Sequence, residues 1–210
     1  MKLRGAVGCL MLMIGCSLLS IAQATMARAT APTEGGAPPP PLKVALSGKA
    51  LQKFDQARSL ALQYLAGKRC STFLGGHGIA TKDVAKALSS QQPQDGTASS
   101  ISFAAAGIAN VNLDPHSGDA IQTVFNNPAY LTMAVSQPRG AETYYNPLLL
   151  TRKVSYPYSN AVSVIHEALH NLTGDSDVAL AQELGYNGFE PLGANVYLND
   201  TLKKYCDSKR

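Results

Sequence analysis

Residues 159–174 read SNAVSVIHEALHNLTG, and they have the spacing of an amphipathic helix. Four apolar residues recur at steps of three and four along this stretch: Val162, Ile165, Leu169 and Leu172. Such spacing places them on one face of a helix. Ser159 or Asn160 can cap its start, because both side chains accept hydrogen bonds from free backbone N–H groups. The stretch therefore predicts a helix with one apolar stripe.

The same helix carries a chemical motif, because His166 and His170 stand four residues apart with Glu167 between them. Side chains at this spacing lie about 5–6 Å apart at Cβ, so both imidazoles can bind one Zn²⁺ with bonds of about 2.0–2.1 Å. Glu167 would sit beside the metal without binding it and could take a proton from metal-bound water. The composition of the chain gives about 0.002 chance matches to this motif. A solvent-facing His-Glu-His cluster is the alternative without chemistry.

Residues 166–170 reproduce the signature of the zincin metallopeptidases, which this chain resembles. The string 166–174 and the tail 193–206 are also similar to a group of small uncharacterised exported bacterial proteins with a zincin helix. The specific match covers about fifteen residues, with a looser similarity in the tail. The resemblance implies a zinc ion, an edge strand that binds substrate, an active-site helix beneath it and a third metal ligand downstream.

Our first choice for that third ligand is Asp177. In the metzincin subgroup, a Gly and then a His or Asp follow the second His by three and six residues, whereas Gly174 and Asp177 follow His170 by four and seven. Gly174 can still turn the chain at the helix end and return Asp177 to the metal. The structural alternative is that Asp177 caps the helix it would start.

Other carboxylates remain as alternative ligands. Glu190 lies twenty residues after His170, the distance found in thermolysin-like enzymes, but Pro191 disfavours helical geometry at Glu190. Glu183 lies on a predicted helix over 178–184, and Asp175 follows the end of the motif helix. The remaining alternative is that no carboxylate serves as a third ligand.

The rest of the chain predicts a single α+β, zincin-like domain over residues 43–210, in which helix, strands and helices follow one another. Helical spacing predicts two more helices, over 49–67 and 81–88, and Gly67 closes the first of them. Pro93 and the pair Asp95-Gly96 are expected to interrupt regular secondary structure after the second of these helices. Short apolar or alternating runs predict strands over 100–103, 108–113, 121–125 and 130–135, with a further edge strand over 154–158.

The N-terminus has the features of a secretory signal peptide over residues 1–24. Basic residues precede an apolar run, and residues 22–24 (AQA) follow as a cleavage site. Residues 13–16 (MIGC) also resemble a lipobox, so lipidation at Cys16 is the alternative to this cleavage. The composition of residues 25–42 predicts a Pro-rich linker, which could also be a pro-segment. We therefore expect a secreted or periplasmic protein, or a lipoprotein.

Cysteine usage agrees with export. Once the leader is removed, Cys70 and Cys206 remain as a pair, and we expect them to form a disulfide. The bond would close a loop of 136 positions, which the chain-entropy model values at about 5 kcal/mol at most. Two buried free thiols are the alternative.

Composition and charge narrow the classes of partner. Charged residues make up 15% and hydrophobic residues 45%, so the chain can build a core. The 18 basic residues exceed the 14 acidic ones only slightly and are scattered, which gives no support for nucleic-acid binding. Only lipidation at Cys16 would bring the protein to a membrane, and we expect a monomer.

The sequence thus predicts an exported zinc metallopeptidase that hydrolyses peptide bonds in a peptide or protein substrate, with Glu167 as general base. One alternative keeps the metal but is an amidase acting on cell-wall peptides, or a zinc-stabilised domain without a substrate. Another leaves the motif inert and binds a partner through a Tyr-rich surface: Tyr144, Tyr145, Tyr156 and Tyr158.

Three further residues receive no role in this prediction. Tyr186 could donate a hydrogen bond to a developing oxyanion, but a turn Tyr that rests on the core is the simpler expectation. His77 and His116 lie in predicted loops and are expected to be surface residues.

Overall fold

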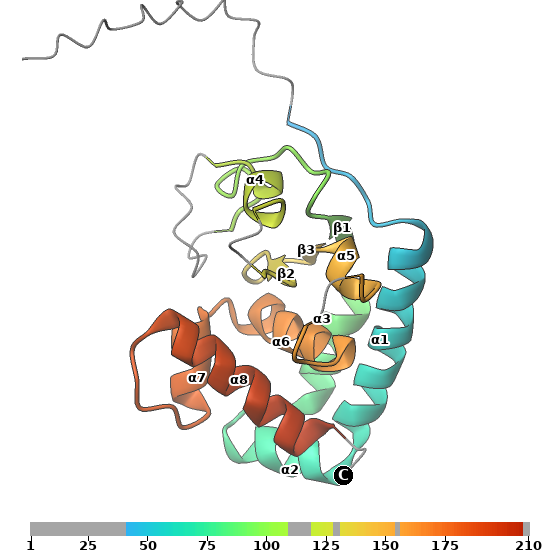
Figure 1. Ribbon diagram of the computed structural model, residues 1–210. Coiled ribbons are helices and arrows are strands. Elements are labelled where there is room, and N and C mark those ends of the chain that lie inside the picture. Colours follow the sequence, from blue (N-terminus) through green and yellow to red (C-terminus); the bar gives the residue numbers. More distant parts are fainter. Residues whose placement is uncertain (1–40, 109–118, 128–130, 154–155, 208–210) are drawn as a thin grey trace, which may run out of the picture. The chain divides into compact units, whose positions relative to one another are not determined.

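The computed structural model describes residues 41–108, 119–127, 131–153 and 156–207, and it has the predicted α+β architecture (Figure 1). The predicted signal peptide and nearly all of the predicted linker lie outside these ranges. In chain order, the elements are α1 (Gly48–Ala66), α2 (Lys68–Gly76), α3 (Thr81–Ser90), β1 (Gln92–Asp95), α4 (Ile121–Phe125), β2 (Ala134–Ser136), β3 (Glu142–Tyr145), α5 (Pro147–Leu150), α6 (Asn160–Thr173), α7 (Asp177–Glu183) and α8 (Pro191–Cys206).

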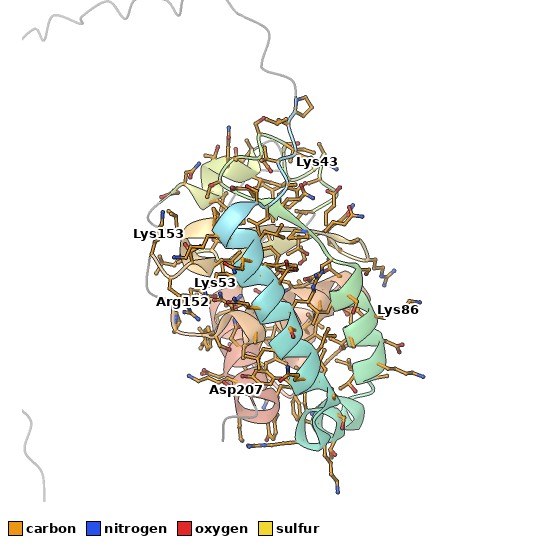
Figure 2. The ribbon with its side chains drawn as sticks, turned by 90° about the vertical axis from the view of Figure 1, so that its right-hand side faces the viewer. Lys43, Lys53, Lys86, Arg152, Lys153 and Asp207 are labelled. Carbon is orange, nitrogen blue, oxygen red and sulfur yellow. A yellow bond between two sulfur atoms is a disulfide. The ribbon has the colours of Figure 1, made fainter. Side chains whose placement is uncertain are left out.

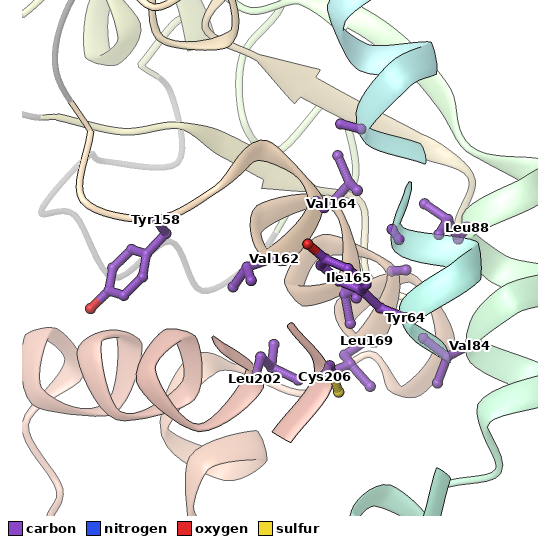
Figure 3. Packing of buried hydrophobic residues seen from close by; sticks show 14 of the residues in the cluster. Tyr64, Val84, Leu88, Tyr158, Val162, Val164, Ile165, Leu169, Leu202 and Cys206 are labelled. Atoms are coloured by element: carbon purple, nitrogen blue, oxygen red, sulfur yellow. The ribbon is translucent and has the colours of Figure 1, made fainter. Parts of the chain in front are cut away.

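The helix predicted from residues 159–174 is α6, and it is the central element of the fold. Every residue from 161 to 169 is buried, because α6 packs against α1 and α3, against α8, and against β2. Figure 3 shows its apolar side chains between Leu202 and Cys206 of α8 and Val84 and Leu88 of α3. Burial of one such aliphatic side chain contributes about 1.5–3 kcal/mol, so this helix anchors the main core.

The strands form one small mixed sheet in the order β1-β3-β2. β1 runs parallel to β3, and β2 runs antiparallel to it, with Ser136 opposite Thr143. Side chains alternate between the two faces of a strand. Tyr145 therefore joins the main core, with its ring 5.1 Å from that of Phe54. Tyr144 points the opposite way, into a second cluster that contains α4.

The helix predictions are confirmed within a residue or two. The predicted helices 49–67, 81–88 and 178–184 correspond to α1, α3 and α7. The Ser159 side chain caps α6 by accepting a hydrogen bond from the Val162 N–H. At the other end of α6, Gly174 adopts φ = 79°, the left-handed conformation that glycine takes without strain. No residue range was predicted for α2, α5 or α8.

The strand predictions are mostly wrong. Residues 121–125 form helix α4, because Ile121, Val124 and Phe125 are also spaced as neighbours on a helix face. The run 100–103 contributes only an isolated bridge at Ser102. The prediction over 130–135 overlaps β2, whereas 108–113 lies outside the described residues apart from Ile108.

The interruption expected at Pro93 and Asp95-Gly96 is confirmed only in part: α3 ends at Ser90 and a turn begins at Gly96, but Pro93 itself lies inside β1. β1 is at an end of the three-stranded order, where a residue without an N–H group is tolerated. Over 154–158, the described residues 156–158 do not form the predicted edge strand. β3 was not predicted at all.

A disulfide between Cys70 of α2 and Cys206 of α8 is present, as predicted. It ties the last residue of α8 to the early part of the domain across 136 positions of sequence. Both cysteines are buried, with exposures of 1% and 3%.

The labelled basic side chains project outward at separate places on the ribbon (Figure 2). Within the described ranges, none of the helices combines the length and apolar character that a membrane crossing requires.

Replacement of both Cys70 and Cys206 by Ser should lower the free energy of unfolding by about 2–5 kcal/mol, because the unfolded chain regains the entropy of a long open loop. Guanidinium unfolding followed by circular dichroism measures this change. Reductant should lower the midpoint of the wild-type protein and leave that of the double variant unchanged. Equal midpoints for the two oxidised proteins would contradict the stabilising role of the bridge.

Candidate metal centre

His166 and His170 project from the same side of α6, one helical turn apart. Their Nε2 atoms lie 2.9 Å from each other, and the ring centroids are 4.8 Å apart. His166 is buried, and the side chain of His170 keeps 14% of its exposure. The splayed, solvent-facing arrangement that was the alternative is therefore not what the structure contains.

Asp177 returns to this pair through a tight turn between α6 and α7. The left-handed Gly174 ends α6, and the Ser176 side chain caps α7 by accepting a hydrogen bond from the Ala179 N–H. Because Ser176 is the cap, the Asp177 carboxylate is directed to the two imidazoles instead. Its Oδ1 lies 2.8 Å from Nε2 of His166 and 2.9 Å from Nε2 of His170.

The turn itself is held by a second contact. Arg139 donates from Nε to the Thr173 carbonyl oxygen at 2.9 Å, and its side chain lies against Gly174. A Cβ on residue 174 would come within 2.7 Å of Arg139 Cγ. Both the left-handed backbone and this close approach therefore require glycine at the point where the chain turns back.

The outer atoms of the three side chains are each held by a hydrogen bond. His170 Nδ1 lies 2.7 Å from the backbone oxygen of Asp175, which can only accept. His166 Nδ1 lies 3.2 Å from Oδ1 of Asn199, whose Nδ2 donates to Asn195. The second carboxylate oxygen of Asp177 accepts from Nδ2 of Asn195 at 2.9 Å.

These partners determine where the imidazole protons lie. Because both Nδ1 atoms face acceptors, each neutral ring carries its hydrogen on Nδ1 and presents a lone pair at Nε2. Two nitrogen lone pairs and a carboxylate oxygen then meet within 2.9 Å of one another. Such donors repel unless a positive charge lies among them. Two His and one carboxylate are also a ligand set that proteins use for divalent transition metals. The residues His166, His170 and Asp177 can therefore hold a metal ion.

The electrostatics of the group favour a positive charge at this point, which a proton on His166 supplies when no metal is bound. Burial alone would lower the pKa of His166, but the neighbouring Asp177 carboxylate raises that pKa to about 9. Burial would likewise raise the pKa of Asp177, yet the His166 and His170 imidazoles hold it well below its ordinary range. The pocket thus stabilises positive charge on the imidazole side and negative charge on Asp177.

The other predicted carboxylates lie elsewhere. Glu183 is exposed on α7, and Glu190 is exposed as the residue that precedes α8, with Pro191 at the first helical position as its sequence suggested. Glu190 accepts a hydrogen bond from the Tyr186 hydroxyl at 3.2 Å. Asp175 contributes only its backbone oxygen, which contacts Nδ1 of His170.

Glu167 is buried, with 7% exposure, but is not one of the three converging residues. Its Oε2 accepts a hydrogen bond from Ser136 Oγ of β2 at 2.7 Å. Burial raises the pKa of Tyr156, which lies just before α6, and the negative charges of nearby Glu167 and Asp177 raise it further. Sequence reasoning had placed Tyr156 on a binding surface instead.

The predicted Tyr-rich surface is wrong, because most of its members are core residues. Tyr144 and Tyr145 have no exposed surface, and Tyr158 retains 8%. Tyr186 packs beside Tyr197, with ring centroids 5.2 Å apart, as a Tyr resting on the core should. His77 is exposed, as predicted, and His116 lies outside the described residues.

Sequence reasoning missed the supporting residues Asn195, Asn199 and Ser136. One signal was available for the first two, since two asparagines four residues apart lie on one face of a helix although asparagine is a poor helix former.

Comparison with known proteins finds no matching family model, no matching curated protein and no matching solved structure.

Asp177→Ala should lower the affinity for a divalent transition metal ion by more than about 100-fold, because one of three ligands is lost and the two imidazoles remain. Metal analysis of the purified proteins, together with chelator competition, measures the change. Glu183→Ala is the matched control, because it removes an acidic side chain from the exposed face of the same helix. Equal metal affinities in the two variants would contradict the site.

In protein stripped of metal, the free energy of unfolding should fall as the pH rises from about 6.5 to about 9. The pKa of folded His166, about 9, lies above the ordinary value of 6.5, so the folded chain holds this proton more tightly than the unfolded chain. The resulting stability is complete below pH 6.5 and is lost as the pH passes the folded pKa. Urea unfolding at several pH values measures the slope, and Asp177→Asn should flatten it. A slope of the opposite sign would contradict the assigned electrostatics.

Proposed function

We propose that this protein is a zinc-dependent metallopeptidase in which His166, His170 and Asp177 bind the ion and Glu167 is the general base. One observation carries the proposal: three ligand atoms converge at one point, and the described residues bring no fourth His, Cys, Asp or Glu to it. Structural zinc sites usually close the metal with four protein ligands, whereas catalytic sites use three and keep one position open.

Access to the site supports the same conclusion. His166 and Asp177 are buried, with side-chain exposures of 4% and 8%, but His170 keeps 14%. A mostly buried ligand set that reaches the surface at one ligand suits a site that must exchange water and substrate. Zinc is favoured over iron, which also binds two His and one carboxylate, because Glu167 follows the first His within the His-Glu-x-x-His motif.

In this proposal, each residue of the site has a separate role in hydrolysis. When bound, zinc supplies a Lewis acid that polarises a carbonyl group and lowers the pKa of water toward about 7. Glu167 accepts the proton of the attacking water and then delivers it to the nitrogen of the leaving amine. The new C–O bond forms as the water attacks, and the peptide C–N bond then breaks once its nitrogen has received the proton. Asn195, Asn199 and the Asp175 carbonyl keep the ligands oriented throughout.

Glu167→Gln should retain zinc and lose at least about 100-fold in turnover, because the amide cannot accept the proton. Zinc content by metal analysis and cleavage of labelled casein measure the two properties. Glu183→Gln, the same substitution on the exposed face of α7, should keep both. A Glu167→Gln protein that cleaves casein like the wild type would contradict the assignment. Hydrolysis of peptidoglycan but not casein by the wild-type protein would instead assign it as a cell-wall amidase.

A further inference from the structure

A buried chain of hydrogen bonds runs from Glu167 into the sheet, on the side of α6 that faces the strands. Ser136 Oγ lies 2.7 Å from Glu167 Oε2 and 3.0 Å from Thr143 Oγ1. Thr143 Oγ1 lies 3.2 Å from Oδ1 of Asn171. All four residues are at most 7% exposed. These hydrogen bonds are therefore shielded from water, which makes them stronger and makes their loss more costly.

The position of the two hydroxyls follows from strand register and helix spacing. Ser136 of β2 and Thr143 of β3 are direct partners in the antiparallel ladder, so their side chains lie on the same face of the sheet. Glu167 and Asn171 stand four residues apart on α6 and occupy one helix face. Packing of α6 against β2 then brings the two pairs together.

At the Asn171 end of this series of hydrogen bonds, each donor and acceptor can be assigned. Asn171 donates from Nδ2 to the Gln137 carbonyl oxygen, so its Oδ1 is the acceptor atom. That oxygen also accepts from Nε2 of Gln91, whose own Oε1 accepts from the Tyr145 hydroxyl. Asn171 Oδ1 is therefore a hydrogen-bond acceptor in a fixed position beside the Thr143 hydroxyl.

We propose that Ser136 is a positioning residue for Glu167, and that the pair Ser136–Thr143 holds the carboxyl group in place. This inference rests on the proposed function and extends it, since it assigns the group that orients the general base. Glu167 has three rotatable side-chain bonds and, once ionised and buried, needs a donor that fixes one of its oxygens.

The hydrogen count fixes the direction of the contact with Glu167. An ionised carboxylate can only accept, so the Ser136 hydroxyl donates to Glu167 Oε2. The Ser136 hydrogen is then used, and Thr143 donates its own hydrogen either to Ser136 Oγ or to Asn171 Oδ1. Thr143 thus supports the Ser136 hydroxyl from the side away from Glu167.

Removal of the donor should therefore affect the chemical step more than binding. In Ser136→Ala we expect kcat to fall by about 10–100-fold, the range found when a group that orients an active-site residue is lost. KM should stay within about twofold, and zinc content should not change, because Ser136 forms its hydrogen bonds with Glu167 and Thr143, on the side of α6 that faces the strands. Ser136→Thr keeps the hydroxyl and should restore kcat to within about threefold of the wild type. Thr143→Val, which removes the next link, should give a smaller fall in kcat.

The experiment measures kcat and KM on a quenched-fluorescence peptide derived from casein, with zinc content determined on the same samples. Ser99→Ala is the matched control, because Ser99 is buried like Ser136 and its hydroxyl donates to the backbone oxygen of Asp95 at 2.7 Å. It should cost comparable stability and leave kcat unchanged. Unchanged kcat in Ser136→Ala, or an equal loss in Ser136→Ala and Ser136→Thr, would overturn the proposal. Loss of zinc from Ser136→Ala would overturn it as well.

A second measurement separates this inference from the proposed function. Melting temperatures of Ser136→Ala, Glu167→Ala and the double variant form a cycle that needs no enzymatic activity. If Ser136 holds Glu167, the double variant should lose less than the sum of the two single losses. Additive losses would overturn the positioning contact even in an active enzyme. A wild-type protein that binds zinc but cleaves neither casein nor peptidoglycan contradicts the proposed function alone, and a non-additive cycle would still support the contact.

Discussion

Two imidazole nitrogens and one carboxylate oxygen are held within 2.9 Å of one another, and this crowding of lone pairs is the constraint that the fold satisfies. It requires α6 to be rigid, since a frayed helix would not keep His166 and His170 in step. It also requires the chain to reverse within a few residues, which Gly174 and Ser176 accomplish. Finally, α8 must lie alongside so that Asn195 and Asn199 can orient the ligands.

Two sides of α6 carry polar residues with different hydrogen-bond partners. One side of the helix presents the imidazoles to α7 and α8, where the hydrogen bonds come from side-chain amides and a backbone carbonyl. Another side presents Glu167 and Asn171 to the sheet, where the partners are hydroxyls. Neighbouring residues of one motif therefore have separate supporting structures, and a change in the hydroxyl pair need not disturb the metal ligands.

The parts that could be predicted from sequence are those determined by local rules. Helical periodicity, the Ser159 cap and Gly174 located α6 and suggested the return of Asp177, because each acts within a few residues. The strands failed for the opposite reason. Ile121–Phe125 has apolar spacing that suits either element, and Pro93 became acceptable only because β1 has its place at an end of the sheet. Ser136 and Asn195 owe their positions to the packing of distant segments, which no local pattern encodes.

The register between β2 and β3 also limits the insertions and deletions that the protein can accept between these strands. Ser136 and Thr143 face α6 only in the observed alignment, while Val135 packs on the opposite cluster. Loss or gain of a single amino acid between the two strands would exchange these faces and place an aliphatic group against the Glu167 carboxylate. In an evolving lineage, insertions and deletions in this hairpin should therefore be rarer than point substitutions, even though its tip is exposed to solvent at Arg139.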